Sequence, residues 1–193
     1  MAYGEFAWLD SGDIVAFCVT LAKGLSAQEA LERAGCDVTT LAWLSAAEAM
    51  DRQPPRSGPD SGPVRAARVG EWAVLLEFET RAGADWAVLQ RLSRGAEAVS
   101  VADSDQVGLF CYAVDGVLVA SFDTTVPEQR YGVDPDRLLG QMRAVGLLST
   151  AQGAPVAISS RQGAMRLIQE ITGVVIDEET MFDEELLTAW LVA

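Results

Sequence analysis

The chain has 193 residues, half of them apolar, and carries a formal net charge of −14 at neutral pH. This length suffices for one domain with a hydrophobic core, and the apolar content excludes intrinsic disorder. No apolar run is long enough to span a membrane, and the acidic start lacks the positive charge of a signal peptide, so we expect a cytoplasmic protein.

The negative charge is spread along the chain, with its densest block in "DEETMFDEE" at residues 177–185. This charge would repel a phosphate backbone, so we expect no nucleic-acid binding. An acidic surface can speed the capture of a basic partner, and its other interpretation is that the acids only keep the protein in solution.

The first elements are a strand and a helix. Residues 13–23 predict a buried strand and residues 26–35 a short helix. Ser26 is the expected N-cap, Glu29 completes a capping box, and Gly35 ends the helix.

A second helix is predicted over residues 39–52, where Leu41 and Leu44 recur at helical spacing. Residues 53–63 then include four prolines and two glycines. This composition fits neither a helix nor a strand and predicts a flexible loop.

The middle of the chain predicts a sheet. Residues 65–79 predict a β-hairpin that turns at Gly70 and Glu71, residues 84–95 a helix, and residues 96–103 a strand.

A further hairpin over residues 107–122 has the clearest local signal. Asp115 and Gly116 fit a type I′ turn, which needs positive φ at both positions. Both faces of this hairpin are apolar, so we expect it to be central and mostly buried. The turn predicts pairing of Val114 with Val117, Ala113 with Leu118, and Phe110 with Ser121.

Three helices follow, at residues 135–145, 161–172 and 178–191. Asp134 is the expected N-cap of the first, with Pro135 in its first turn. We expect the last helix to dock with its acidic first turn in solvent, through Leu186, Leu187, Trp190 and Leu191.

Together these elements predict one α+β domain over residues 1–193. Its sheet is expected to be mainly antiparallel with about five to seven strands, and helices are expected to pack on it.

The sequence lacks the residues and motifs of several common catalytic and metal-binding sites. The chain has no histidine, which excludes Ser-His-Asp and Cys-His catalysis and imidazole zinc sites. Its cysteines, Cys18, Cys36 and Cys111, are dispersed and predict buried thiols. No phosphate-loop, dinucleotide or nucleophile-elbow motif occurs. We therefore expect no catalytic residue, no metal and no cofactor.

Two weaker patterns involve carboxylates. Residues 103–108, "DSDQVG", resemble the start of a calcium loop, but Val107 and Val114 occupy ligand positions, which favours a strand-end turn. Glu77 and Glu79 share one face of a strand and could serve acid–base chemistry, although such a pair on an exposed face is typical of solvation.

Several segments together resemble an uncharacterised actinobacterial family, abundant in streptomycetes and known mainly as a numbered domain of unknown function. They include "WLDSG", "CVTLAKGLSAQEALERAG", "RVGEWAVLLE", "YAVDGVLVASFD" and "LIQEITGVVIDEE". The resemblance covers most of the chain except residues 53–63 and 148–160. It implies a cytosolic actinobacterial protein and brings no activity, cofactor or catalytic residue.

We therefore expect a non-catalytic protein-binding module with an acidic surface, comparable by analogy to immunity proteins or accessory subunits. Its partner is expected to be a protein or peptide, with basic character favoured. Candidate partner-binding residues are Glu128, Arg130 and Tyr131, which turn chemistry does not require, and Asp183 and Glu184 in the acidic block.

Two alternatives remain open. Arg130 could pair internally with an acid while Tyr131 fills a gap under its loop. The protein could also be a small-molecule sensor or enzyme with a pocket on the sheet, using Arg130, Tyr131, Trp72 or Trp86.

Overall fold

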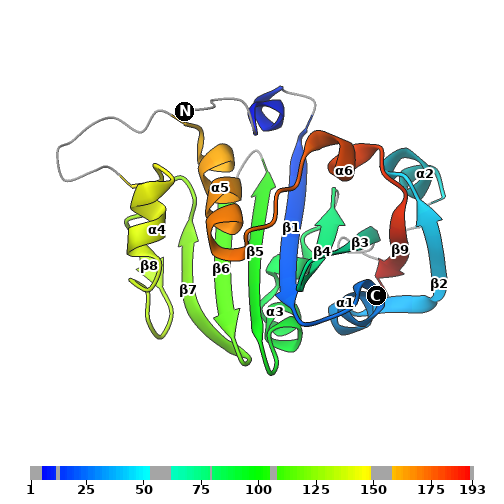
Figure 1. Cartoon of the computed structure of the whole chain (residues 1–193), viewed down its shortest axis with the longest axis horizontal. Coiled ribbons are helices and arrows are strands. Elements are labelled where there is room, and N and C mark those ends of the chain that lie inside the picture. The colour runs from blue at the N-terminus through cyan, green and yellow to red at the C-terminus, as the bar shows by residue number, and fades with distance from the viewer. Residues whose placement is uncertain are drawn as a thin grey trace.

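One antiparallel sheet organises the protein. The computed structural model describes residues 6–11, 14–52, 62–78, 80–104, 108–148 and 158–191. These residues form nine strands in the order β2-β9-β3-β4-β1-β5-β6-β7-β8 (Figure 1). The strands are β1 Ala16–Lys23, β2 Cys36–Leu44, β3 Pro63–Val69, β4 Trp72–Glu77, β5 Glu97–Ser104, β6 Gly108–Val114, β7 Val117–Asp123, β8 Arg130–Tyr131 and β9 Leu186–Leu191.

Helices cover both faces of the sheet. They are α1 Ala27–Ala34, α2 Ala46–Asp51, α3 Trp86–Leu92, α4 Leu139–Ala144, α5 Ser160–Thr172 and α6 Glu178–Phe182, with 3-10 turns η1 Ala7–Asp10 and η2 Ala82–Ala84. On one face, here called the α5 face, α4, α5 and α6 bury Met142, Ile168 and Met181 (Figure 1). On the opposite α1 face, α1 and α3 bury Leu31 and Leu89. The central strands are therefore apolar on both sides.

The predicted fold is wrong in the size of its sheet, which has nine strands instead of five to seven. One missed strand is β2, where a helix was predicted over residues 39–52. Only Ala46–Asp51 of that range is helical, and Ser45 caps it in a box with Glu48. The helical spacing of the leucines was misleading because β2 is stabilised by pairing with β9, far away in sequence.

The predicted C-terminal helix over residues 178–191 is also wrong. The helix α6 ends at Phe182, and Leu186–Leu191 forms β9 between β2 and β3. A short apolar run such as "LLTAWL" suits a strand as well as a helix, and here two neighbouring strands decide between them.

Local signals were more reliable elsewhere. The helix predicted at 26–35 is present as α1: the Ser26 and Glu29 capping box is complete, and Gly35 ends the helix with a φ of 98°. The hairpin predicted at 65–79 is present as β3 and β4, with Val69 opposite Trp72.

The hairpin of β6 and β7 has the predicted turn, with positive φ at Asp115 and Gly116. Its register is correct for the first two pairs and then shifts at a bulge, where Val119 lies between the partners of Tyr112 and Ala113. Beyond the bulge, Phe110 pairs with Phe122 and not with Ser121. The bulge is stabilised by the returning chain, whose Asp134 N–H donates to the Val119 carbonyl at 3.0 Å.

The helix predicted from residue 135 begins four residues later, as α4. Asp134 does not cap it, since the N-cap residue is Leu138, without a side-chain hydrogen bond.

The predicted flexible loop at 53–63 lies mostly outside the described residues, with Pro63 as the first residue of β3. None of the helices in the described parts is both long and apolar enough to cross a membrane.

Candidate functional site

The acidic block at residues 177–185, here called the acidic segment, spans α6 and the turn into β9. All six of its carboxylates are exposed: Asp177, Glu178, Glu179, Asp183, Glu184 and Glu185. Asp177 caps α6 through the Thr180 N–H, and this hydrogen bond lowers the pKa of the Asp177 carboxyl. The predicted site residues Asp183 and Glu184 thus lie on the surface, as a binding role requires.

A buried arginine holds the turn that carries these acids. Arg65 on β3 is 1% exposed, and its guanidinium donates to the carbonyls of Met181 at 2.6 Å and Glu184 at 2.5 Å. Burial lowers the pKa of Arg65 to about 10, so the side chain stays charged at neutral pH. The acidic segment is therefore anchored from below by a cation, which also offsets part of its negative charge.

The edge strand β2 lies beside the acidic segment. Leu44 pairs with Leu186, which directly follows Glu185, and α2 contacts α6 (Figure 1). Trp43 on this strand is 64% exposed. A large exposed aromatic side chain at a sheet edge is a common feature of protein interfaces. Trp43 is not among the predicted site residues, because the spacing of the leucines predicted a helix here.

The segment over residues 124–132 follows β7 and lies at the opposite edge of the sheet, where it includes β8. Arg130 on β8 donates to one Asp136 carboxylate oxygen at 2.8 and 3.1 Å and to the Pro127 carbonyl at 2.8 Å. The internal role considered for Arg130 is therefore what the structure shows. Tyr131 is 64% exposed, so it does not fill a gap under the loop.

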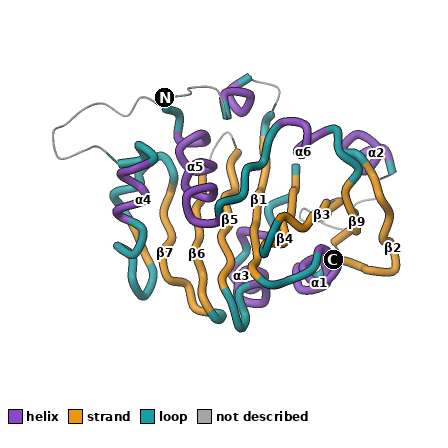
Figure 2. The backbone as a smooth tube through the Cα atoms, in the orientation of Figure 1, coloured by secondary structure: helices purple, strands orange, loops and turns teal. Residues whose placement is uncertain are grey.

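The five candidate residues do not form one surface. Arg130 and Tyr131 lie on β8 at one edge of the sheet, whereas Asp183 and Glu184 precede β9 near the other edge. Figure 2 shows β9 and α6 well separated from the end of the sheet that carries α4. Six strands lie between β8 and β9, so seven strand spacings, or about 34 Å along the sheet, separate the two strands. A single partner would need a large interface to contact both groups.

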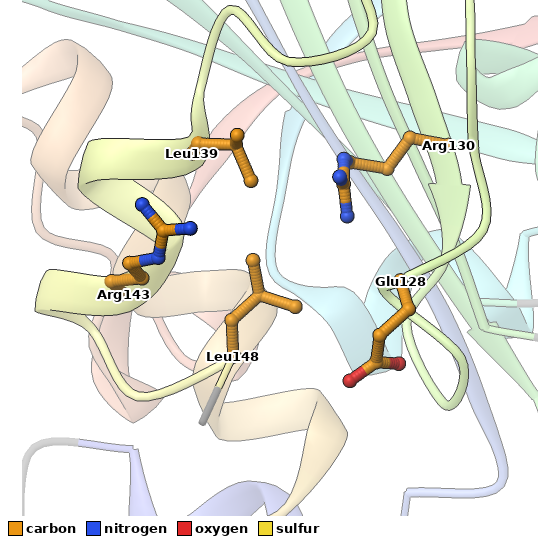
Figure 3. A pocket seen from close by; sticks show the side chains of 5 residues that line it. All are labelled: Glu128, Arg130, Leu139, Arg143 and Leu148. Carbon is orange, nitrogen blue, oxygen red and sulfur yellow. The ribbon is translucent and has the colours of Figure 1, made fainter. Parts of the chain in front are cut away.

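A shallow pocket of about 250 Å³ lies between the 124–132 segment and α4. Figure 3 shows its lining: Glu128, Arg130, Leu139, Arg143 and Leu148. The two leucines form an apolar wall, with a carboxylate and two guanidinium groups around it. The pocket contains two of the predicted residues, Glu128 and Arg130, but no nucleophile paired with a base.

A buried polar cluster lies under η2 on the α1 face. Glu77 accepts hydrogen bonds from the Thr80 hydroxyl at 2.5 Å and from the N–H groups of Ala82 and Gly83 at 2.8 and 2.9 Å. A Cβ atom on Gly83 would lie 2.0 Å from Thr20 Oγ1, so only glycine allows this approach. Glu77 is thus buried, unlike the exposed pair predicted with Glu79, which lies outside the described residues. The cluster fixes the turn and is closed to substrates.

The cysteines are free and buried, as predicted. Burial raises the pKa of the Cys18 and Cys111 thiols and raises that of Cys36 to about 12. All three therefore remain thiols at neutral pH, which does not suit a nucleophile.

The segment that resembles a calcium loop lies partly outside the described residues, which omit 105–107. Asp103 lies on β5 and pairs with Arg161 of α5, with 2.5 Å between Oδ1 and Nε. Asp105 lies outside the described residues. Among the residues that the structure describes, no group of three or more potential ligands could hold a metal ion.

Comparison with known protein families identifies a match over nearly the whole chain. A model described as "Family of unknown function (DUF6461)" matches residues 2–192. The chain belongs to this family. No curated protein matches it, and no solved structure matches it. The DUF6461 assignment carries no activity.

Glu77 provides a test of the buried cluster through pH. Burial raises the pKa of its carboxyl, and the hydrogen bonds from Thr80, Gly83 and Ala82 oppose this rise. Above the ordinary value of 4.5, the unfolded chain releases a proton that the folded chain still holds, so stability falls as pH rises through the folded pKa.

Glu77→Gln removes this titration. We expect the loss of unfolding free energy caused by Glu77→Gln to be largest below about pH 4.5 and to shrink as the pH rises toward neutral. Urea unfolding at a series of pH values measures it, with the exposed Glu71 changed to Gln as the control. A difference that stays constant with pH would show that the Glu77 pKa is not raised by folding.

Proposed function

We propose that this protein is a non-catalytic module of the actinobacterial cytoplasm that binds a basic protein or peptide through the acidic segment, acting as an immunity-like or accessory subunit. One observation carries the proposal: the exposed carboxylates of the acidic segment and the exposed Trp43 lie at the same end of the sheet, on its two sides. The aromatic ring supplies apolar contact area, and the carboxylates supply long-range attraction to a cation-bearing surface.

The charge of the whole chain supports a basic partner. A net charge of −14 raises the rate of encounter with a positively charged protein and opposes binding of acidic ones. The local density in the acidic segment then orients the partner. Because Arg65 anchors the backbone beneath, these side chains are presented from an ordered turn, which reduces the entropy lost on binding.

The proposal predicts a specific loss of binding. Neutralising three acids, with Asp183→Asn, Glu184→Gln and Glu185→Gln together, should weaken partner binding by about tenfold or more. The partner is identified by affinity capture from the native host with mass spectrometry, and its dissociation constant is then measured with the purified proteins.

A matched control separates local from overall charge. Neutralising the exposed Glu32, Glu71 and Glu170 instead removes the same charge from other elements and should change affinity by no more than about threefold. Equal losses in the two triple variants would contradict a defined acidic site. Capture of an acidic partner that the first variant still binds would contradict the proposal as a whole.

The alternative, a small-molecule sensor, is favoured by the pocket beside α4. Glu128 and Arg143 there could bind the ammonium and carboxylate groups of an aliphatic amino acid, with its side chain on Leu139 and Leu148. Saturable binding of leucine that Arg143→Gln abolishes would favour this function.

A further inference from the structure

The strand β2 exposes backbone groups, as well as side chains, at the edge of the sheet. With nine residues, β2 is much longer than the two-residue β8 that forms the other edge, although its register with β9 shifts between Asp37 and Ala42, so the regular stretch beside Trp43 is Ala42–Leu44. No described strand pairs with its outer side. A long edge with unpaired backbone groups is a template for another strand, and proteins usually protect it.

The hydrogen-bond pattern shows which backbone groups point outward. The Leu191 N–H donates to the Gly62 carbonyl, on the β3 side of β9. Because backbone groups alternate sides along a strand, Leu187 also faces β3. The residue opposite Leu187 on β2 is Trp43. Because the backbone groups of Leu187 face β3, no backbone hydrogen bonds join Leu187 and Trp43. The N–H and C=O of Trp43 therefore point away from the sheet.

The two sides of this edge differ in chemistry. Trp43 lies opposite Leu187, which packs on the α1-face core, so the indole is on that side. The helix α6 packs on the α5 face through Met181, and its acids are exposed there. A strand added to β2 would alternate its side chains between the two sides. One row would meet Trp43, and the other would point toward the side that carries the acidic segment.

We infer that β2 binds an extended segment of the partner as an additional strand, in which apolar residues alternate with lysine or arginine. This inference rests on the proposed function and specifies its binding mode. The backbone groups of β2 give affinity, Trp43 selects the apolar row, and the acidic segment selects the basic row. A second copy of this chain is disfavoured as the occupant because two chains that each carry a net charge of −14 repel each other.

The test uses two dye-labelled synthetic peptides of about eight residues. One alternates lysine and valine, and the other has the same composition with its lysines and valines in two blocks. Both carry the same charge, so the acidic segment attracts them alike. Strand addition predicts that the alternating peptide binds the wild-type chain about tenfold more tightly by fluorescence anisotropy.

Two variants of Trp43 separate the contribution of the indole ring to peptide binding from that of the backbone N–H. Trp43→Ala removes the indole and keeps the outward N–H, whereas Trp43→Pro removes both and leaves the bonds between β2 and β9 intact. We expect a weaker preference for the alternating peptide with alanine and none with proline. Circular dichroism checks folding. Hydrogen exchange in the wild type is a second readout, because the alternating peptide should protect the Trp43 amide.

Each other result overturns strand addition. Equal affinity for the two peptides, lost when the three acids are neutralised, would leave the proposed acidic site intact and exclude this binding mode. Failure of both peptides to bind would also exclude it, while the capture experiment still decides the proposed function. Protection of the Trp43 amide without peptide, in a chain that sediments as a dimer, would show a second copy at the edge.

Discussion

Replacing Phe122 by alanine lowers the free energy of unfolding by about 3–5 kcal/mol, the range expected for deleting a buried aromatic side chain. Phe122 is 1% exposed and stacks on Phe110 with ring centroids 4.8 Å apart. This contact exists because the bulge at Val119 brings the two rings into register. The variant therefore loses both core volume and an aromatic pair. Urea unfolding monitored by circular dichroism measures the change.

The neighbouring Leu118 provides the control. It lies before the bulge and is only partly buried, so Leu118→Ala should cost about 1 kcal/mol. The difference between the two variants tests the register itself. Similar losses for Phe122→Ala and Leu118→Ala would contradict the bulge and support the regular pairing of Phe110 with Ser121.

Replacing Arg65 by methionine is expected to lower the free energy of unfolding by about 2–4 kcal/mol. Methionine is similar in length but removes the guanidinium hydrogen bonds to the carbonyls of Met181 and Glu184. Burial of the charged guanidinium costs free energy, which is also why the pKa of Arg65 is lowered. Methionine avoids this cost, and that gain offsets part of the loss. The turn should also become less ordered, which hydrogen exchange over residues 181–186 would detect.

The exposed Arg68 on the same strand is the matched control, since Arg68→Met removes the same charge with little burial. Its expected change is within about 0.5 kcal/mol. If both variants had the same stability as the wild type, the buried guanidinium would not anchor the acidic segment. Loss of partner binding in a folded Arg65→Met variant would connect this anchor to the proposed function.

The candidate site was only partly predictable. The exposure of Asp183 and Glu184 follows from charge density alone, because carboxylates are rarely buried without partners. Glu128 and Arg130 are two residues apart, and both line one pocket, but their role in partner binding stays a prediction. Trp43 could not be found, because its exposure depends on β2 being an edge strand.

The features that the sequence predicts correctly depend on neighbouring residues. Ser26 with Glu29, Gly35, and the turn at Asp115 and Gly116 act within a few residues, so their chemistry is complete in the local sequence.

The sheet edge at β2 and the buried Arg65 anchor depend on contacts between residues that are far apart in the sequence. The strands β2 and β9 are about 150 residues apart at the pair of Cys36 with Leu191, and β9 also pairs with β3. Arg65 is separated from Met181 by 116 residues. Strand pairing and charge burial are stabilised by such distant partners, and a local pattern of leucines carries no information about them.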